Sequence, residues 1–320
     1  MLHDDKDLFR QVIEGTAKEL QMSRAIVEKD YYVTALLAEI SKRTPDLVFK
    51  GGTSLSKCYK IIQRFSEDID LNLSGVNRPT EGQRRALKHN ITDSIDALNL
   101  ALANPENVRS KRDFNCYMID YRSQYHSGSV KDKLQVETAV FLRTYPYGKA
   151  KATSYIQDFL EKSGRNDLVD KLELPQCELN VQSIERTLID KCFAVADYYM
   201  TGRTDSHSRH LYDIYRLMEY IKVDNELKAL AETVRLDRQA DAQCPSAKEN
   251  VDLNSVLKEI LKKAVYEKDY AEVTENILYP TEHLPYSEAV KGLQEVIDSK
   301  LFVKSQDTIA KPKEAFILKK

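Results

Sequence analysis

Two aspartates and a pair of glycines lie close together in residues 49–73 of this 320-residue chain. Gly51 and Gly52 follow a short apolar run, and glycine lets the amides of a turn approach a phosphate without an intervening side chain. Asp68 and Asp70 are separated by one residue, which places both carboxylates on one face of a strand. Such carboxylates repel each other unless a divalent cation lies between them. The combination predicts magnesium-dependent (or manganese-dependent) transfer of a nucleotide.

A third carboxylate on a neighbouring strand would complete such a metal site. Glu137 is the first candidate, because it interrupts an otherwise apolar, strand-like run at residues 133–142, where an acid needs a partner. Residues 116–122 are also strand-like, and the Ser-Gly-Ser sequence at 127–129 suits a hairpin loop between the two segments. Asp120 in the first of these strands is therefore the alternative third ligand, and the sequence leaves the choice open.

The elements around the two motifs follow from residue periodicity. Val48 and Phe49 end a short buried strand, and the glycine turn then opens a helix that Thr53 and Ser54 can cap. Apolar residues recur at helical spacing as far as residue 62, and from residue 68 the apolar period becomes two. If residues 66–70 are extended, Ser66 shares a face with the two aspartates, which makes its hydroxyl a candidate regulatory modification site. The alternative is a hydrogen bond from Ser66 to the local turn.

The sequences KGGTSL at residues 50–55 and RFSEDIDL at residues 64–71 resemble the AbiEii/AbiGii toxin family of nucleotidyltransferases, which are MenT-like proteins of type IV toxin-antitoxin systems. Three further segments resemble the same family: VEKDYYV at 27–33, ERTLIDK at 185–191 and HLYDIYRL at 210–217. The resemblance implies an α+β fold with a DNA-polymerase-β-like nucleotidyltransferase core, a mixed sheet and a helical carboxy-terminal lobe.

The resemblance also implies roles for particular residues. The expected catalytic residues are Asp68, Asp70, Lys191 and Asp213, with Asp213 orienting the lysine. The expected nucleotide-binding residues are Gly51, Gly52, Thr53, Ser54, Lys57 and Lys191, and the expected metal ligands are Asp68, Asp70 and Glu137. In this family the acceptor of the nucleotide can be RNA, including the 3′ end of tRNA, and a cognate AbiEi-like antitoxin holds the toxin in check.

Composition is that of an ordinary enzyme with a sizeable core. The chain is 42% hydrophobic and 31% charged, and its formal net charge of −2 argues against a domain that coats nucleic acid non-specifically. Local basic patches remain candidate RNA contacts: Arg84, Arg85 and Lys88, and Arg109, Lys111 and Arg112. The five cysteines have neither zinc-like nor Cys-x-x-Cys spacing, so we expect free thiols. Without a signal sequence or a membrane-length apolar run, we expect a cytoplasmic protein without membrane contact.

Helical periodicity dominates both ends of the chain. We expect helices at residues 5–22, 24–43 and 82–103, and then at 181–200, 207–221, 224–235, 251–267 and 285–299. The stretch Leu174-Pro175-Gln176 and the polar segment 236–250 are candidate boundaries between the lobes. The expected lobes are a nucleotidyltransferase lobe at 1–175 and a helical lobe at 176–320 that contributes to the active-site cleft.

Each signal also has an ordinary structural explanation. Gly-Gly-Thr is often only a tight turn, and Asp-Ile-Asp is often the exposed face of an edge strand. Lysine and aspartate on helices commonly form surface ion pairs, here Lys191 with Glu185 or Asp190 and Asp213 with Arg209 or Arg216. The order and combination of the segments favour the enzymatic interpretation. Two alternatives remain: a transferase that modifies protein, whether by nucleotidylylation or as a phosphotransferase, and a catalytically silent nucleotide-binding module.

Overall fold

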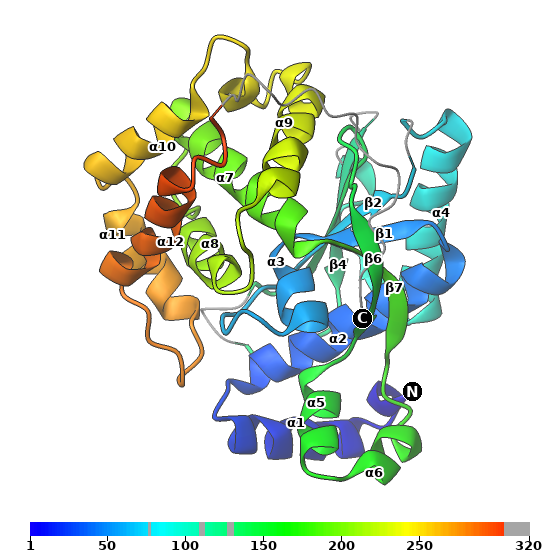
Figure 1. Ribbon diagram of the computed structural model, residues 1–320. Coiled ribbons are helices and arrows are strands. Elements are labelled where there is room, and N and C mark those ends of the chain that lie inside the picture. Colours follow the sequence, from blue (N-terminus) through cyan, green and yellow to red (C-terminus); the bar gives the residue numbers. More distant parts are fainter. Residues whose placement is uncertain (76–77, 109–112, 127–130, 304–320) are drawn as a thin grey trace. The chain divides into compact units, whose positions relative to one another are not determined.

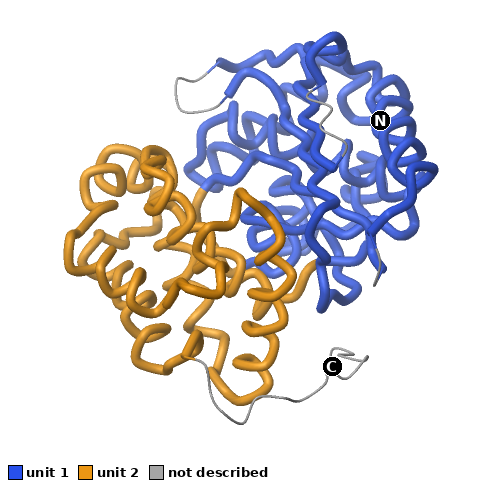
Figure 2. The backbone as a smooth tube through the Cα atoms, turned by 90° about the horizontal axis from the view of Figure 1, so that it is seen from above, with its two compact units in different colours: residues 1–60, 65–181 blue, residues 61–64, 182–320 orange. Residues whose placement is uncertain are grey.

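The chain divides into two compact units in a computed structural model that describes residues 1–75, 78–108, 113–126 and 131–303. Unit 1 comprises residues 1–60 and 65–181, and unit 2 comprises residues 61–64 and 182–320 (Figure 2). The expected hairpin loop at 127–129 and the basic patch at 109–112 lie outside the described residues.

Unit 1 is built on a mixed sheet, which confirms the α+β class (Figure 1). Its strands are β1 (Leu47–Lys50), β2 (Asp68–Leu73), β3 (Ala101–Leu102), β4 (Phe114–Asp120), β5 (Leu134–Ala139), β6 (Tyr147–Ala152) and β7 (Cys177–Gln182). Across the described residues the strand order is β3-β4-β5-β2-β1-β7-β6. The central strand β2 is antiparallel to β1 and parallel to β5. Strand β7 pairs with β1, so the sheet continues beyond the expected lobe boundary at residue 175.

Helices of unit 1 surround α2 (Arg24–Arg43), whose apolar side chains enter the main core. Helices α1 (Lys6–Leu20) and α5 (Tyr155–Lys162) both pack on α2, and α6 (Asn166–Lys171) follows α5 (Figure 1). Helix α4 (Glu81–Ala97) also packs on α2. The expected helix at 82–103 was too long. Asn99 adopts a left-handed conformation (φ 54°), and residues 101–102 then pair with β4 as a strand.

Unit 2 is largely helical over its described residues. Its main helices are α7 (Ile184–Met200), α8 (Arg209–Met218), α9 (Asn225–Gln239), α10 (Leu253–Lys262) and α12 (Tyr286–Asp298), with a short α11 (Glu267–Asp269) between the last two. Helices were expected in all five main segments. Helix α9 extends to Gln239, into the polar segment 236–250 that was a candidate boundary, and Arg238 near its end is buried.

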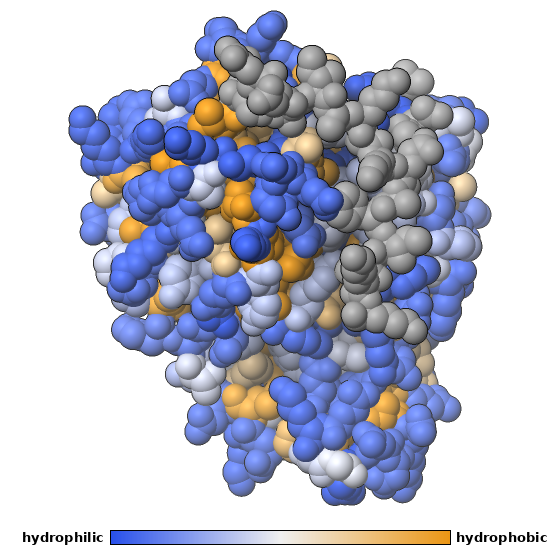
Figure 3. Space-filling view, in the orientation of Figure 1, coloured by the Kyte–Doolittle hydropathy of each residue, from blue (hydrophilic) through white to orange (hydrophobic). Residues whose placement is uncertain are grey.

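The surface and the thiols agree with an ordinary globular protein. Hydrophilic residues cover most of the face in Figure 3, and apolar residues show between them, several of them grouped near its centre. All five cysteines are free, as expected. Arg84 and Arg85 on α4 pair with Asp113 and Glu81, so acids partly neutralise this expected basic patch. Among the described helices, none has the length and apolarity needed to cross a bilayer.

Candidate active site

The glycine turn and the aspartate strand are in direct contact in unit 1. Gly51 begins α3 (Gly51–Ser54) with a positive φ of 79°, a conformation that favours glycine. A Cβ atom at this position would lie 2.1 Å from Oδ2 of Asp70, far inside van der Waals contact. The absence of a side chain therefore lets the Asp70 carboxylate pack against the turn. The group in close contact with this glycine is thus a carboxylate of the protein, and the approach of a phosphate to the turn stays a prediction.

Thr53 and Ser54 do not cap the helix as expected, because the helix begins at Gly51 and Lys50 is its N-cap. The Thr53 hydroxyl instead donates to the main-chain oxygen of Asp68 (2.6 Å), and its oxygen lies 3.0 Å from the Ser66 hydroxyl. Ser54 donates to the carbonyl of Gly51 (2.8 Å). The bond from Thr53 to Asp68 joins the glycine turn to the beginning of β2. Ser66 precedes the strand, and its hydroxyl faces Thr53; modification of Ser66 stays a prediction.

The register of the sheet decides which acids are neighbours. Asp68 and Asp70 lie two residues apart in β2 and therefore share a face, and Asp70 is paired with Glu137 on the parallel strand β5. Asp120 is on β4, and β5 separates that strand from β2. Its carboxylate accepts a hydrogen bond from the amide of Arg122 (2.8 Å). Of the two candidates for the third carboxylate, Glu137 is the one next to the aspartate strand.

Two of these carboxylates have side-chain partners. The side chain of Gln135 donates to Glu137 (2.6 Å), and the ammonium of Lys131 lies 3.0 Å from Oδ1 of Asp68. Across the described ranges there is no group of three or more His, Cys, Asp or Glu side chains that is ready to hold a metal ion. Any ion bound here would take part of its coordination shell from substrate oxygens and water, which is the usual arrangement for Mg²⁺.

Three consecutive charged residues on α2 are buried and hold three different segments of unit 1. Glu28 accepts from the Ser123 hydroxyl and the Gln124 amide, and Lys29 donates to Glu67. Asp30 accepts from Lys57 and from the amide of Tyr155. Burial raises the pKa of Glu28 and Asp30 and lowers the pKa of Lys29, each partly opposed by these partners. The sequence feature that could have indicated these buried contacts is the run of three charged residues in a helix otherwise rich in apolar residues.

Lys57 occupies a different place from the one expected of a nucleotide-binding lysine. Its side chain is 1% exposed, and its ammonium donates to the Asp30 carboxylate (2.5 Å), to the Asp30 carbonyl (3.1 Å) and to the Thr34 hydroxyl (2.6 Å). An ammonium has three protons, and all three have acceptors here. The expectation of a direct phosphate contact is therefore corrected: Lys57 anchors the segment after the glycine turn to α2.

A second charged cluster lies inside unit 2. Lys191 on α7 donates to Oδ2 of Asp213 on α8 (2.5 Å), so the contact expected between them is present. Arg64 binds both oxygens of the same carboxylate, through Nε and Nη2, at 2.7 Å each. All three side chains are buried, with Asp213 fully inaccessible. Burial alone would raise the pKa of Asp213, but the charges of Arg64 and Lys191 outweigh burial and hold that pKa below its ordinary value.

Arg64 is the member of this cluster that the sequence did not single out. It precedes the aspartate motif in the chain, yet it belongs to unit 2, where Arg64 forms a β-bridge with Leu278. A bidentate Arg–carboxylate contact fixes both partners in one plane. Burial lowers the pKa of Lys191, and Asp213 opposes this shift. Leu188, Cys192 and Val195, which lie on the same helix as Lys191, are all buried in the core.

The family model for the nucleotidyl transferase AbiEii toxin of type IV toxin-antitoxin systems matches residues 35–298. The chain belongs to this family. The matched range contains the glycine turn, the aspartate strand and the Arg64–Asp213–Lys191 cluster, whereas the buried charges on α2 precede it. Nucleotidyltransferase activity in general, and pairing with an antitoxin, follow from membership of this AbiEii family.

Among solved structures, the crystal structure of JHP933 from Helicobacter pylori is similar to this AbiEii protein. The two share 18% sequence identity with a TM-score of 0.43, and the similarity covers 86% of this chain and 91% of JHP933. A search of curated proteins found no match.

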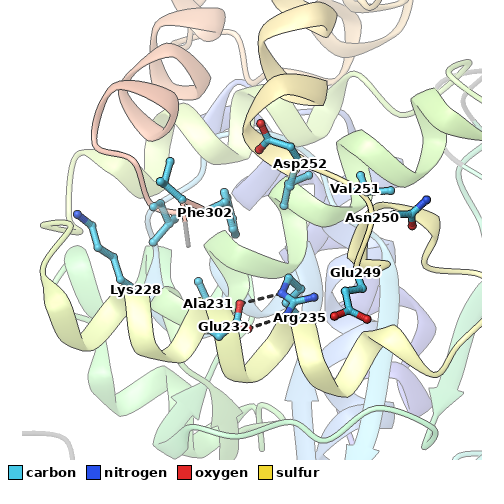
Figure 4. Close-up of a pocket in the computed structure, with 12 residues that line it drawn as sticks. Lys228, Ala231, Glu232, Arg235, Glu249, Asn250, Val251, Asp252 and Phe302 are labelled. Carbon is cyan, nitrogen blue, oxygen red and sulfur yellow. Dashed lines mark hydrogen bonds and ion pairs between the residues drawn. The ribbon is translucent and has the colours of Figure 1, made fainter. Parts of the chain in front are cut away.

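One cavity in unit 2 of the AbiEii protein has a volume of about 550 Å³ (Figure 4). Helix α9 and residues 249–253 and 301–303 line it, and an ion pair between Glu232 and Arg235 crosses its wall. None of the expected catalytic, nucleotide-binding or metal-binding residues lines this cavity.

Proposed function

We propose that this AbiEii protein is a magnesium-dependent nucleotidyltransferase toxin that moves a nucleoside monophosphate from a nucleoside triphosphate to an acceptor hydroxyl. The observation that carries this proposal is the contact between Gly51 and Asp70, because it joins the glycine turn to the carboxylate face of β2. A chain from a nucleotidyltransferase family with this contact has the two parts that the reaction needs, a turn that phosphate can approach and acids that bind metal.

The donor set fits Mg²⁺ or Mn²⁺. Hard divalent cations bind oxygen, and Mg²⁺ commonly uses one or two carboxylates together with substrate phosphates and water. Asp68 and Asp70 supply the carboxylates on one strand face, and Glu137 lies beside Asp70 on the next strand. A bound ion would neutralise charge on the triphosphate and on the attacking oxygen. Strand β2, with β1 and β5 on either side, supports a DNA-polymerase-β-like arrangement.

The protein's own groups then have separate tasks. The turn at Gly51 and Gly52 presents amides to phosphate, and the Thr53 hydroxyl keeps that turn against Asp68. In unit 2, Asp213 and Arg64 hold the Lys191 side chain in one position. We assign to Lys191 the contact with the triphosphate, as a compact positive charge whose position is set before substrate binds.

The proposed acceptor is RNA, and its 3′ end in tRNA offers the free hydroxyl that the reaction requires. The proposed partner is an AbiEi-like antitoxin. Family membership supports both, since a toxin of a type IV system acts on a cellular target and is neutralised by its cognate antitoxin. Growth arrest on expression, relieved by the antitoxin gene, is the expected phenotype.

The test is incubation of the purified protein with each α-³²P-labelled nucleoside triphosphate, magnesium and total RNA. We expect label in RNA, enriched in the tRNA fraction, and loss of transfer on chelation with EDTA. The double variant Asp68→Ala/Asp70→Ala is expected to abolish transfer. Asp96→Ala, at an exposed position on α4, is the matched control and is expected to keep full activity.

The destination of the label separates the proposal from its alternatives. Label on protein that depends on Asp68 and Asp70 would identify a protein nucleotidylyltransferase. Transfer only from γ-labelled nucleotide would identify a phosphotransferase. Growth arrest that persists in the double variant without any transfer would identify a binding module and would contradict the proposal.

A further inference from the structure

Four charged side chains meet where β2 begins. The ammonium of Lys131 lies 3.0 Å from Oδ1 of Asp68 and 3.6 Å from Oε1 of Glu67, and it also contacts the Gln135 side chain (3.4 Å). Lys131 comes just before β5, the strand parallel to β2. The Lys131 ammonium is therefore already paired with Asp68, which is one of the two carboxylates assigned to the divalent ion.

A buried lysine holds this arrangement in place. Lys29 on α2 is fully buried, and its ammonium donates to Oε2 of Glu67 (2.5 Å) and to the main-chain oxygen of Lys131 (2.7 Å). One group thus binds the residue next to Asp68 and the backbone of Lys131. Because both chain segments are fixed to the same ammonium, the meeting of Lys131 with Asp68 is built into unit 1.

The Lys131 side chain is nevertheless able to withdraw. Its side chain is 49% exposed and that of Asp68 is 28% exposed, whereas Lys29 is 0% exposed. Exposed lysine pairs are weak, and the flexible stem costs little to move. A divalent ion on Asp68 would repel the Lys131 ammonium, because two positive charges beside the same carboxylate repel each other. The ammonium and the ion therefore compete for the same carboxylate.

We propose that Lys131 is a resident cation on Asp68 that the divalent ion must displace, so that metal binding is an exchange of one cation for another. This proposal rests on the proposed function, because it concerns the same metal site. Glu67, at 3.6 Å, is the acceptor to which the displaced ammonium can turn. Lys131 thereby sets the metal concentration at which the site fills.

Removal of the competing charge should tighten metal binding. We expect Lys131→Met to lower the dissociation constant for Mn²⁺ about fivefold, the change that corresponds to a partly exposed ion pair of about 1 kcal/mol. Lys131→Arg keeps the charge and should bind Mn²⁺ within about twofold of the native protein on the same reasoning. Lys133→Met removes an exposed lysine two residues away and is the matched control. We expect its dissociation constant for Mn²⁺ to equal that of the native protein.

The experiment is a titration of the full chain with Mn²⁺ in the absence of nucleotide, followed by the electron paramagnetic resonance signal of the free ion. Asp68→Asn is titrated in both the native and the Lys131→Met backgrounds. Tighter binding in Lys131→Met that disappears with Asp68→Asn supports the exchange. Thermal melting of each variant shows that the comparison is made between folded proteins.

Two results would overturn the exchange and bear differently on the proposed function. If Mn²⁺ binding depends on Asp68 but is equal in the native protein and Lys131→Met, the exchange is wrong while the metal site stands. If Asp68→Asn changes binding in neither background, or if neither protein binds Mn²⁺, the ion is not held by Asp68, and both the exchange and the assigned metal site fail.

Discussion

Replacement of Asp213 by asparagine should destabilise unit 2 strongly. The change leaves Arg64 and Lys191, both buried, without the carboxylate that each now binds at 2.7 Å and 2.5 Å. Removal of one partner from a buried ion pair costs about 3–5 kcal/mol, because the remaining charge stays desolvated and uncompensated. At roughly 2–4 °C per kcal/mol for a domain of this size, the melting temperature should fall by roughly 6–20 °C.

The assay is thermal unfolding of the native protein and the variant, with Glu219→Gln as the control. Glu219 lies just after α8 and pairs with Arg216 at the surface, with 41% of its side chain exposed, so its loss should cost less than about 1 kcal/mol. The double variant Asp213→Asn/Lys191→Met removes one of the two charges that Asp213→Asn leaves without a partner. Its loss of unfolding free energy should therefore be smaller than the sum of the losses of the two single variants. A melting temperature for Asp213→Asn within about 2 °C of the native value, or strict additivity in the double variant, would refute the electrostatic argument.

The same cluster predicts a pH dependence with a definite sign. The folded state lowers the pKa of Asp213 because Arg64 and Lys191 outweigh the effect of burial. The ionised Asp213 carboxylate therefore contributes its full stabilisation above the pKa of about 3.9 that aspartate has in the unfolded chain. This stabilisation is lost as the pH falls toward the lower pKa of Asp213 in the folded protein. We expect the difference in melting temperature between the native protein and Asp213→Asn to be constant from pH 7 to pH 5 and to narrow below about pH 4.

Three further variants test the geometry of unit 1. Gly51→Ala introduces a Cβ atom 2.1 Å from a carboxylate oxygen and should lower the rate of nucleotide transfer roughly a hundredfold, whereas Gly15→Ala, with open space around it, should leave the rate unchanged. Lys57→Met breaks a buried ion pair and should lower the free energy of unfolding by about 3–5 kcal/mol in a denaturant titration; a loss below about 1 kcal/mol would contradict its anchoring role. Glu137→Gln should raise the magnesium concentration needed for half-maximal transfer, while Asp120→Asn should not; the reverse result would assign the third carboxylate to Asp120.

Local patterns in the sequence predicted the elements that carry the site. The alternation from Asp68 to Leu73 corresponds to β2, and the glycines after Phe49 lie at the start of α3, directly after β1. These predictions worked because side-chain periodicity and glycine conformation are properties of a few neighbouring residues. The wrong prediction of a helix cap nearby has a local cause as well. Thr53 was expected as a cap, but the turn at Gly51 begins the helix earlier and leaves its hydroxyl to bind the next strand.

The tertiary structure decided which charges meet. Arg64 and Asp213 are 149 residues apart in the chain, and Lys29 and the Lys131 carbonyl are 102 apart. The sequence by itself determined the family, the mixed fold and the two aspartates on one face, because these follow from motifs and short-range periodicity. It did not determine that Lys57 would turn into the core, or that Lys131 would reach Asp68. Those contacts depend on strand register and helix packing, which bring distant residues within hydrogen-bonding distance only in the folded chain.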